Sequence, residues 1–188
     1  MRLLEEEIET FGDLIVGDFE DTYFNLTLKM QHTFTWVATF CRIGRPIVLI
    51  IDDDVPFSAP FLDEAICQQS LNQGDLLHGI PEKRAKVVRF DKFKSRWWLS
   101  KVEMPMPEYP IYTYGVYNLM SFKSLQYLTL GMLFTRPHHI DDAYLGLVAA
   151  RLGLKFRNIY SILSREHILH DPRNQSELDH PWRINPTT

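Results

Sequence analysis

Apolar positions recur at helical spacing in several parts of the chain. Between residues 24 and 41, Met30, Phe34 and Val37 fall on one face, which predicts an amphipathic helix with a buried side. Gly153 follows another such stretch and is well placed to form a helix C-cap. Four further helices are expected at residues 2–11, 60–71, 121–132 and 141–152.

Short apolar runs bounded by breakers predict strands. The run IVLII at residues 47–51 follows Pro46 and carries no charge, as expected for a central strand covered on both faces. Further strands are expected at residues 14–16, 76–80, 96–100 and 111–114. Strands that alternate with helices predict an α/β fold with a mostly parallel central sheet flanked by helices. No repeat or linker interrupts the pattern, so residues 1–188 are expected to form a single domain.

Composition narrows the class of protein. The 188 residues are 45% hydrophobic and 23% charged, which is typical of a globular domain. A net charge of −4 without a long basic run gives no electrostatic basis for binding nucleic acid. No apolar stretch approaches the roughly 20 residues of a membrane-spanning helix. The acidic N-terminus does not resemble a signal peptide, so any targeting segment is expected outside this chain.

The cysteines and the glycosylation triplets say little about the compartment. Cys41 and Cys67 are either two buried thiols or one disulfide, and two cysteines do not decide between them. Asn25 and Asn174 both begin triplets that fit the N-glycosylation pattern. Such triplets are common by chance, so each alone is weak evidence for a lumenal protein.

Three consecutive carboxylates, Asp52, Asp53 and Asp54, follow the run at residues 47–51. Ligands of open α/β sheets bind beyond the carboxyl ends of strands, and adjacent carboxylates repel one another unless a cation compensates. A divalent ion such as Mg²⁺ or Mn²⁺ prefers these oxygens and also binds a diphosphate. The alternative is a solvated turn, because Asp favours turns and strand ends.

A second acidic pair, Asp141 and Asp142, opens the helix expected at residues 141–152. Free backbone N–H groups stabilise carboxylates at a helix start, so capping alone explains both residues. The functional alternative makes one of them a general base that deprotonates an attacking hydroxyl. Capping would then hold the base ionised.

The neighbouring Trp97 and Trp98 also allow two interpretations. Their aromatic faces suit stacking against a sugar ring, but large aromatic side chains belong more often to a core. From the residues alone, the core is favoured.

An ordered set of motifs resembles the β-1,3-galactosyltransferase family, which includes related N-acetylglucosaminyltransferases. The Asp triplet with Val55 is similar to the family's "DDDV", and Asp141–Asp142 begin a stretch similar to "EDVY.G…LG". The other matching segments are Phe11-Gly12-Asp13-Leu14-Ile15, Asp18-Phe19, Asp21-Thr22-Tyr23, Asn25-Leu26-Thr27-Leu28-Lys29, Trp36, Cys41, Trp98-Leu99-Ser100, Tyr109-Pro110, Tyr112 and Gly115. Together they cover roughly residues 5–154.

The resemblance implies a fold, a reaction and a cofactor. The fold is the GT-A type of nucleotide-diphospho-sugar transferase, and the reaction moves galactose or N-acetylglucosamine from a UDP-sugar to a glycan acceptor with inversion. By position, Asp52 and Asp54 become Mn²⁺ ligands and Asp142 the catalytic base. Donor or substrate contacts are expected at Asp53, Asp141, Trp98 and Gly115. Asn25 is expected to be a glycosylation site.

The family also has a metal-binding His near its C-terminal end. His170 is the best candidate here and His167 the second, although a surface His is the commoner explanation for either residue. The family's lumenal Golgi location and its type II membrane anchor are implied for the full-length protein.

The chain also departs from the family pattern. The family's first half, which holds the uridine, is expected before residue 1, so the resemblance implies an N-terminally truncated domain. Tyr117 and Asn118 stand where the family has Gly-Tyr, and a side chain there is expected to crowd a substrate or strain the backbone. Thr113 and Val148 replace two cysteines whose pairing is an inference from their joint loss.

Three classes of function remain open on these grounds. Sugar transfer leads. A catalytically degraded family member that binds or scaffolds a partner is the alternative, and a metal-dependent phosphohydrolase rests on the Asp triplet alone.

Overall fold

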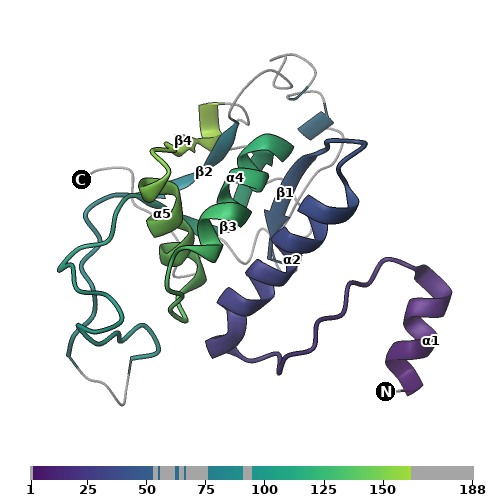
Figure 1. Cartoon of the computed structure of the whole chain (residues 1–188), viewed down its shortest axis with the longest axis horizontal. Helices are drawn as coiled ribbons and strands as arrows, with labels where there is room; N and C mark the ends of the chain where they lie inside the picture. The colour runs from purple at the N-terminus through teal and green to yellow at the C-terminus, as the bar shows by residue number, and fades with distance from the viewer. Residues whose placement is uncertain are drawn as a thin grey trace, which may run out of the picture.

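The computed structural model describes residues 2–52, 55, 62–63, 66, 76–90 and 95–161 (Figure 1). Among these described residues, the longer helices are α1 (Arg2–Phe11), α2 (Leu26–Phe40), α4 (Phe122–Leu133) and α5 (Asp141–Arg151), with 3₁₀ turns η1 (Tyr23–Asn25) and η2 (Ile159–Ser161). The strands are β1 (Ile47–Ile51), β2 (Leu77–Glu82), β3 (Tyr112–Ser121) and β4 (Arg157–Asn158). None of the described helices is both long enough and apolar enough to cross a membrane.

The helices predicted at residues 2–11, 24–41, 121–132 and 141–152 are confirmed. Ser121 caps α4, where its Oγ accepts the Ser124 N–H at 3.2 Å. At the end of α5, Gly153 has φ +70° and the Leu154 N–H donates to the Ala149 carbonyl at 2.9 Å. This geometry is a Schellman motif, which explains why glycine ends the helix. Most of the helix expected at residues 60–71 lies outside the described residues.

The sheet is mixed, so the prediction of a mostly parallel sheet is wrong. Its strand order is β1-β3-β2-β4, where β3 pairs antiparallel with both neighbours and only the short β4 pairs parallel with β2. In this described sheet β1 is an edge strand with five half-buried residues, and not the covered central strand that its composition indicates. Hydrophobic runs report burial, but they do not report strand direction or order.

Two predicted strands are absent from the described sheet. Residues 14–16 are exposed and belong to no described strand, and residues 96–100 contribute only an isolated bridge between Val88 and Trp98. Both segments have strand-forming side chains but no strand edge to pair with, so propensity alone was misleading. The strand expected at residues 111–114 instead continues to Ser121.

A shift in register interrupts the pairing of β2 with β3. Gly79 faces Asn118, but Pro81 faces Thr113, so residues 114–117 bulge out of the ladder. The buried Asn118 side chain closes the bulge: its Oδ1 accepts the Thr113 hydroxyl, and its Nδ2 donates to the Tyr114 carbonyl at 3.2 Å. A side chain at Gly79 would lie 2.9 Å from the Tyr117 carbonyl oxygen, so the close pairing there requires glycine.

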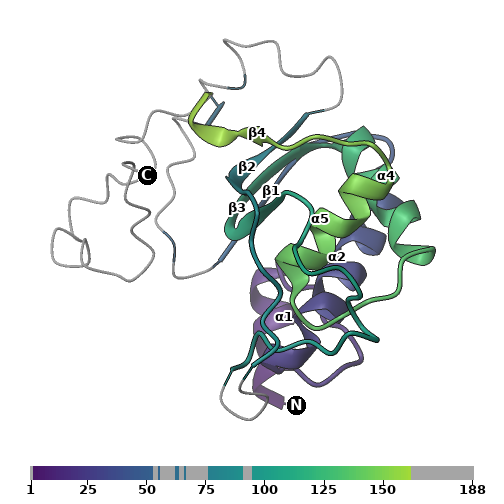
Figure 2. The ribbon, with the colours of Figure 1, turned by 90° about the vertical axis from the view of Figure 1, so that its left-hand side faces the viewer.

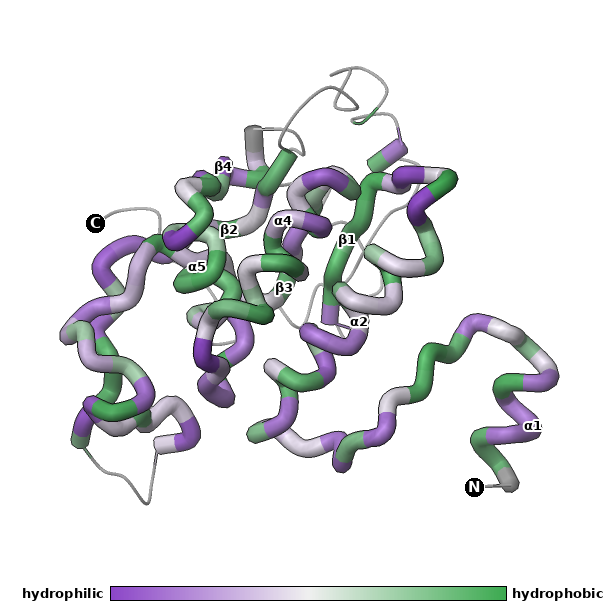
Figure 3. Tube along the Cα trace, in the orientation of Figure 1, coloured by the Kyte–Doolittle hydropathy of each residue, from purple (hydrophilic) through white to green (hydrophobic). Residues whose placement is uncertain are grey.

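Two apolar clusters sandwich the sheet. Helices α2, α4 and α5 gather on one side (Figure 2), and their cluster includes Phe34, Leu128 and Tyr144. On the other side, Tyr117 and Leu119 of β3 pack with residues that include Ile159. Outside this body, the hydrophobic Leu14, Ile15 and Val16 precede η1 and remain exposed (Figure 3). The fold therefore has a helical layer that carries α5 across β3.

Helix α5 approaches the start of β3 closely at Gly146. A Cβ there would lie 2.9 Å from the Tyr112 Cα and 3.0 Å from the Ile111 carbonyl oxygen. We expect Gly146→Ala to lower the free energy of unfolding by roughly 1–3 kcal/mol, because helix and strand must separate. Urea unfolding measures this change. Gly44→Ala is the matched control, since nothing lies within 4 Å of its Cβ. A loss no larger than that of the control would contradict the close contact.

Candidate active site

The first turn of α5 holds the acidic pair. Ile140 precedes the helix, and the Asp142 Oδ1 accepts the Ala143 N–H at 2.6 Å. Backbone N–H groups of the same turn also bond the Asp141 carboxylate. The N-cap residue is Ile140, but the expected stabilisation of both carboxylates by backbone N–H groups of the first turn is confirmed.

Capping does not keep Asp142 readily ionised, contrary to the expectation from sequence. Burial raises the pKa of Asp142 from 3.8 to about 7, and the neighbouring charge of Asp141 adds to this effect. Hydrogen bonds from the Ala143 and Asp142 backbone oppose the shift but are outweighed. Burial also raises the pKa of Asp141. The pair is thus an unusual site where a carboxyl exchanges its proton near neutral pH.

Asp52 lies close enough for its charge to act on this pair. It follows the last residue of β1, Ile51, which pairs with Tyr117 of β3. The negative charge of Asp52 raises the pKa of both Asp141 and Asp142. The fold thus brings together two acidic groups that are separated by almost ninety residues in the sequence.

Several predicted residues fall outside the described part of the chain. They are Asp53, Asp54, Cys67, His167, His170 and Asn174. Among the residues that the structure does describe, no group of three or more His, Cys, Asp or Glu side chains is arranged to hold a metal. The Mn²⁺ site therefore stays a prediction. Of its predicted ligands, Asp52 lies among the described residues, whereas Asp54 and His170 do not.

Three tyrosines from one stretch line up beside the acidic pair. The ring centroids of Tyr109 and Tyr112 lie 5.9 Å apart, and those of Tyr112 and Tyr114 lie 6.1 Å apart. The Tyr114 hydroxyl donates to the Glu82 carboxylate. The charge of Asp142 contributes to a raised pKa at all three tyrosines, although burial is the larger cause. The tyrosines therefore remain neutral hydroxyl groups near the carboxylates.

Tyr114 and Glu82 were not identified from the sequence. They meet because of the register shift between β2 and β3, which no local pattern indicates. Gly115 lies in the same bulge, and nothing occupies the space where a Cβ would stand. Its predicted contact with a substrate remains a prediction.

The two tryptophans differ. Trp98 is half-buried, and its Nε1 donates to the Arg89 carbonyl at 3.1 Å, which ties it to the loop around it. Trp97 is 42% exposed, so the expectation that both belong to a core is wrong for Trp97. A role for Trp98 in donor binding stays a prediction.

Asn25 lies at the junction of η1 and α2, where its Nδ2 donates to the Glu20 carbonyl at 2.9 Å. Its glycosylation remains a prediction. Cys41 is half-buried and forms no disulfide within the described residues, while Cys67 lies outside them.

The departures from the family pattern have structural explanations. Tyr117 does not adopt a positive φ, and its ring is buried in the cluster below the sheet, so the expected backbone strain is absent. Thr113 and Val148 are both fully buried without a thiol. The Thr113 hydroxyl pairs with Asn118, and Val148 packs in the helical layer.

A mixed sheet, a helical layer and carboxylates that converge from β1 and α5 define an α/β domain with an acidic site. The chain belongs to the galactosyltransferase family, whose model matches residues 1–160.

Curated relatives agree with this assignment. Human and mouse β-1,3-galactosyltransferase 1 are each 29% identical over 159 residues, covering 81% of this chain and 46% of theirs. Human lactosylceramide 1,3-N-acetyl-β-D-glucosaminyltransferase is 31% identical over 157 residues, covering 81% of this chain and 40% of its own. A rat protein, UDP-GlcNAc:βGal β-1,3-N-acetylglucosaminyltransferase 7, is 33% identical over 168 residues, with coverages of 82% and 38%. The chain thus spans less than half the length of these relatives.

The raised pKa of Asp142 predicts how stability changes with pH. Between pH 4 and 7 the folded state retains a proton that the unfolded state has released, so the free energy of unfolding falls as pH rises through this window. Asp142→Asn removes that loss. We expect the variant to be more stable than the native chain by roughly 4 kcal/mol at pH 8, because a shift of about three pKa units is lost, and nearly equal to it at pH 4.

Urea titrations at both pH values measure this difference. Asp63→Asn, which removes an exposed carboxylate, is the matched control. A native-like pH dependence in Asp142→Asn would show that burial does not raise the pKa of this carboxyl.

Proposed function

We propose that this chain is the catalytic part of a UDP-sugar-dependent β-1,3-glycosyltransferase. It would move galactose or N-acetylglucosamine to a glycan acceptor, with inversion at the anomeric carbon. The observation that carries the proposal is the convergence of Asp52 with Asp141 and Asp142 in a member of the galactosyltransferase family. The names of the relatives, which transfer these two sugars, support the choice of reaction.

Asp142 is the proposed general base. Its carboxylate takes the proton of an acceptor hydroxyl while that oxygen bonds to the anomeric carbon of the donor sugar. The bond from the anomeric carbon to the diphosphate breaks, and UDP leaves with the electron pair. A base works best when its pKa lies near the working pH, which suits a carboxyl whose pKa is about 7. Asp141 supports this role through its adjacent negative charge.

Mn²⁺ is the proposed cofactor, with Asp52, Asp54 and His170 as its ligands. Carboxylate oxygens suit this hard ion, and Asp52 lies close enough to Asp141 and Asp142 for the charges to interact. When bound, the ion would neutralise the charge that develops on the departing diphosphate. Donor or substrate contacts are proposed for Asp53, Asp141, Trp98 and Gly115.

The proposal includes the GT-A type of fold and a lumenal Golgi location. The mixed sheet with a helical layer is compatible with that fold. The glycosylation triplet at Asn25 supports a lumenal location, and the type II anchor would belong to the full-length protein. The phosphohydrolase alternative gains nothing from the family match.

The first test is calorimetric titration of the chain with UDP, with and without Mn²⁺. We expect binding that depends on Mn²⁺, because the proposed carboxylates would hold the ion and a hard divalent ion favours the binding of a diphosphate. Asp52→Asn should weaken binding in the presence of Mn²⁺, whereas Asp63→Asn should not. If a folded sample fails to bind UDP under either condition, the non-catalytic alternative is favoured.

The second test concerns the base. Asp142→Asn should reduce turnover by roughly 10²–10⁴-fold, because general-base catalysis contributes about this much. UDP binding should stay within twofold of the native value, since the proposed base does not contact the nucleotide. Initial rates with a β-galactoside acceptor provide the measurement. A variant that retains most of its rate would rule out Asp142 as the base.

A further inference from the structure

Five side chains from three separate segments form an exposed aromatic platform. Its members are Tyr23 and Phe24 of η1, Arg96 and Trp97 of the segment before β3, and His139 just before α5. Of its three large aromatic residues, Tyr23 is 40% exposed, Phe24 62% and Trp97 42%. Large aromatic groups that gather on a surface mark binding sites, because exposing them to water is unfavourable.

Arg96 holds the platform together. Its guanidinium carbon lies 4.5 Å from the ring centroid of Tyr23 and 4.6 Å from that of Trp97, so it contacts both faces. The Arg96 carbonyl is joined to the His139 Nε2 at 2.7 Å. The His139 ring in turn lies 5.2 Å from that of Phe24. Each segment is therefore fixed to the others by a direct contact.

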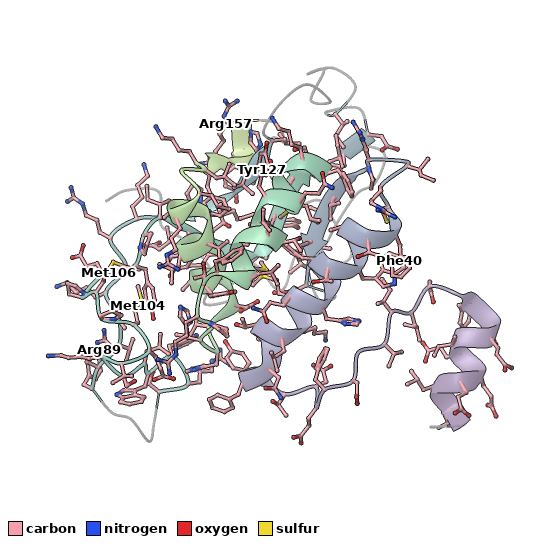
Figure 4. The ribbon with its side chains drawn as sticks, viewed as in Figure 1. Phe40, Arg89, Met104, Met106, Tyr127 and Arg157 are labelled. Atoms are coloured by element: carbon pink, nitrogen blue, oxygen red, sulfur yellow. The ribbon has the colours of Figure 1, made fainter. Side chains whose placement is uncertain are left out.

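Hydrogen bonds from Arg89 fix the segment that follows Trp97. The Arg89 guanidinium donates to the Leu99 carbonyl at 2.7 Å, to the Met106 carbonyl at 3.0 Å and to the Met104 carbonyl (Figure 4). Hydrogen bonds from Ser100 to the Glu103 carboxylate close the turn between them. A surface held in this way binds its ligand without having to be ordered first.

The platform adjoins the candidate active site. His139 precedes Asp141 by two residues and Asp142 by three. The start of α2, the start of α5 and the segment that carries Trp97 all lie at the lower end of the molecule in Figure 1. A chain-like ligand whose end reaches Asp142 would thus pass across the aromatic rings.

We propose that the aromatic platform binds an inner sugar of the acceptor glycan, beyond the sugar that reacts. This inference rests on the proposed function, because it makes the acceptor an oligosaccharide rather than a single sugar. A pyranose ring has a C–H face that packs on Tyr and Trp and hydroxyl groups that accept from Arg N–H donors. Within the described residues no carboxylate is paired with Arg96, so its N–H groups remain available to such hydroxyls.

Other ligands fit the platform less well. A nucleic acid would also stack on aromatic rings, but it requires a basic surface, and the chain has a net charge of −4. A cationic peptide would meet the Arg96 guanidinium at the centre of the platform. A neutral glycan satisfies both the apolar faces and the polar edge.

The test compares two ligands by calorimetry on the whole chain: a tetrasaccharide that ends in β-galactose, and methyl β-galactoside. We expect the native chain to bind the tetrasaccharide at least fivefold more tightly. Trp97→Ala should remove this preference, while its affinity for methyl β-galactoside stays within twofold. Trp97→Phe should restore most of the preference, because it keeps an aromatic face.

Tyr127→Ala is the matched control. Tyr127 is 44% exposed on α4 and also lies beside a cation, since the Lys123 Nζ is 5.6 Å from its ring centroid. It lies far from the lower end of the molecule (Figure 4). Its replacement should leave both affinities unchanged. Thermal unfolding verifies that each variant is folded.

Three results would overturn the platform. In the first, Trp97→Ala binds the tetrasaccharide as tightly as the native chain does. In the second, Trp97→Ala and Tyr127→Ala lose the same affinity for the tetrasaccharide. In the third, the native chain binds UDP but does not prefer the tetrasaccharide to methyl β-galactoside. The last result would leave the proposed function standing. The converse result, a preference that depends on Trp97 without UDP binding, would support the platform and contradict the proposed function.

Discussion

The contact between α5 and β3 at Gly146 is the constraint on which the candidate site depends. Because no side chain intervenes there, the helix lies directly on the strand. This contact holds α5 against Tyr112, the first residue of β3, and so places the acidic start of α5 close to the tyrosines of that strand. The geometry of the site thus depends on the glycine at position 146, because the close packing of helix and strand defines where the charged residues lie.

Two physical effects compete at Asp142, and burial prevails. Backbone N–H groups at a helix start favour the ionised carboxylate, but desolvation and the charges of Asp141 and Asp52 favour the protonated one. A capping residue on a surface helix would remain an ordinary acid. Here the Asp142 carboxyl is itself buried, near the buried Tyr109 and the half-buried Tyr112 and Tyr114, so it exchanges its proton near neutral pH.

The sequence was most informative where structure is local. Helical spacing and caps located α2, α4 and α5, and the apolar run located β1, because neighbouring residues determine these features. Strand direction depends on distant partners, so the mostly parallel sheet was wrong. The pairing of Tyr114 with Glu82 follows from a register shift that no local pattern encodes. Trp97 was expected in the core, but it is 42% exposed and its ring stacks on the Arg96 guanidinium, a contact that no local pattern indicates.

The bulge in β3 is closed by one amide side chain, that of Asn118, which accepts from Thr113 and donates to Tyr114. An aspartate has nearly the same shape, yet it cannot donate to the Tyr114 carbonyl and would introduce a buried charge. Substitution scores rank this exchange among the mildest, although here it would release the backbone around Gly115. In this chain, a replacement that sequence comparison treats as conservative would therefore alter the region around Gly115.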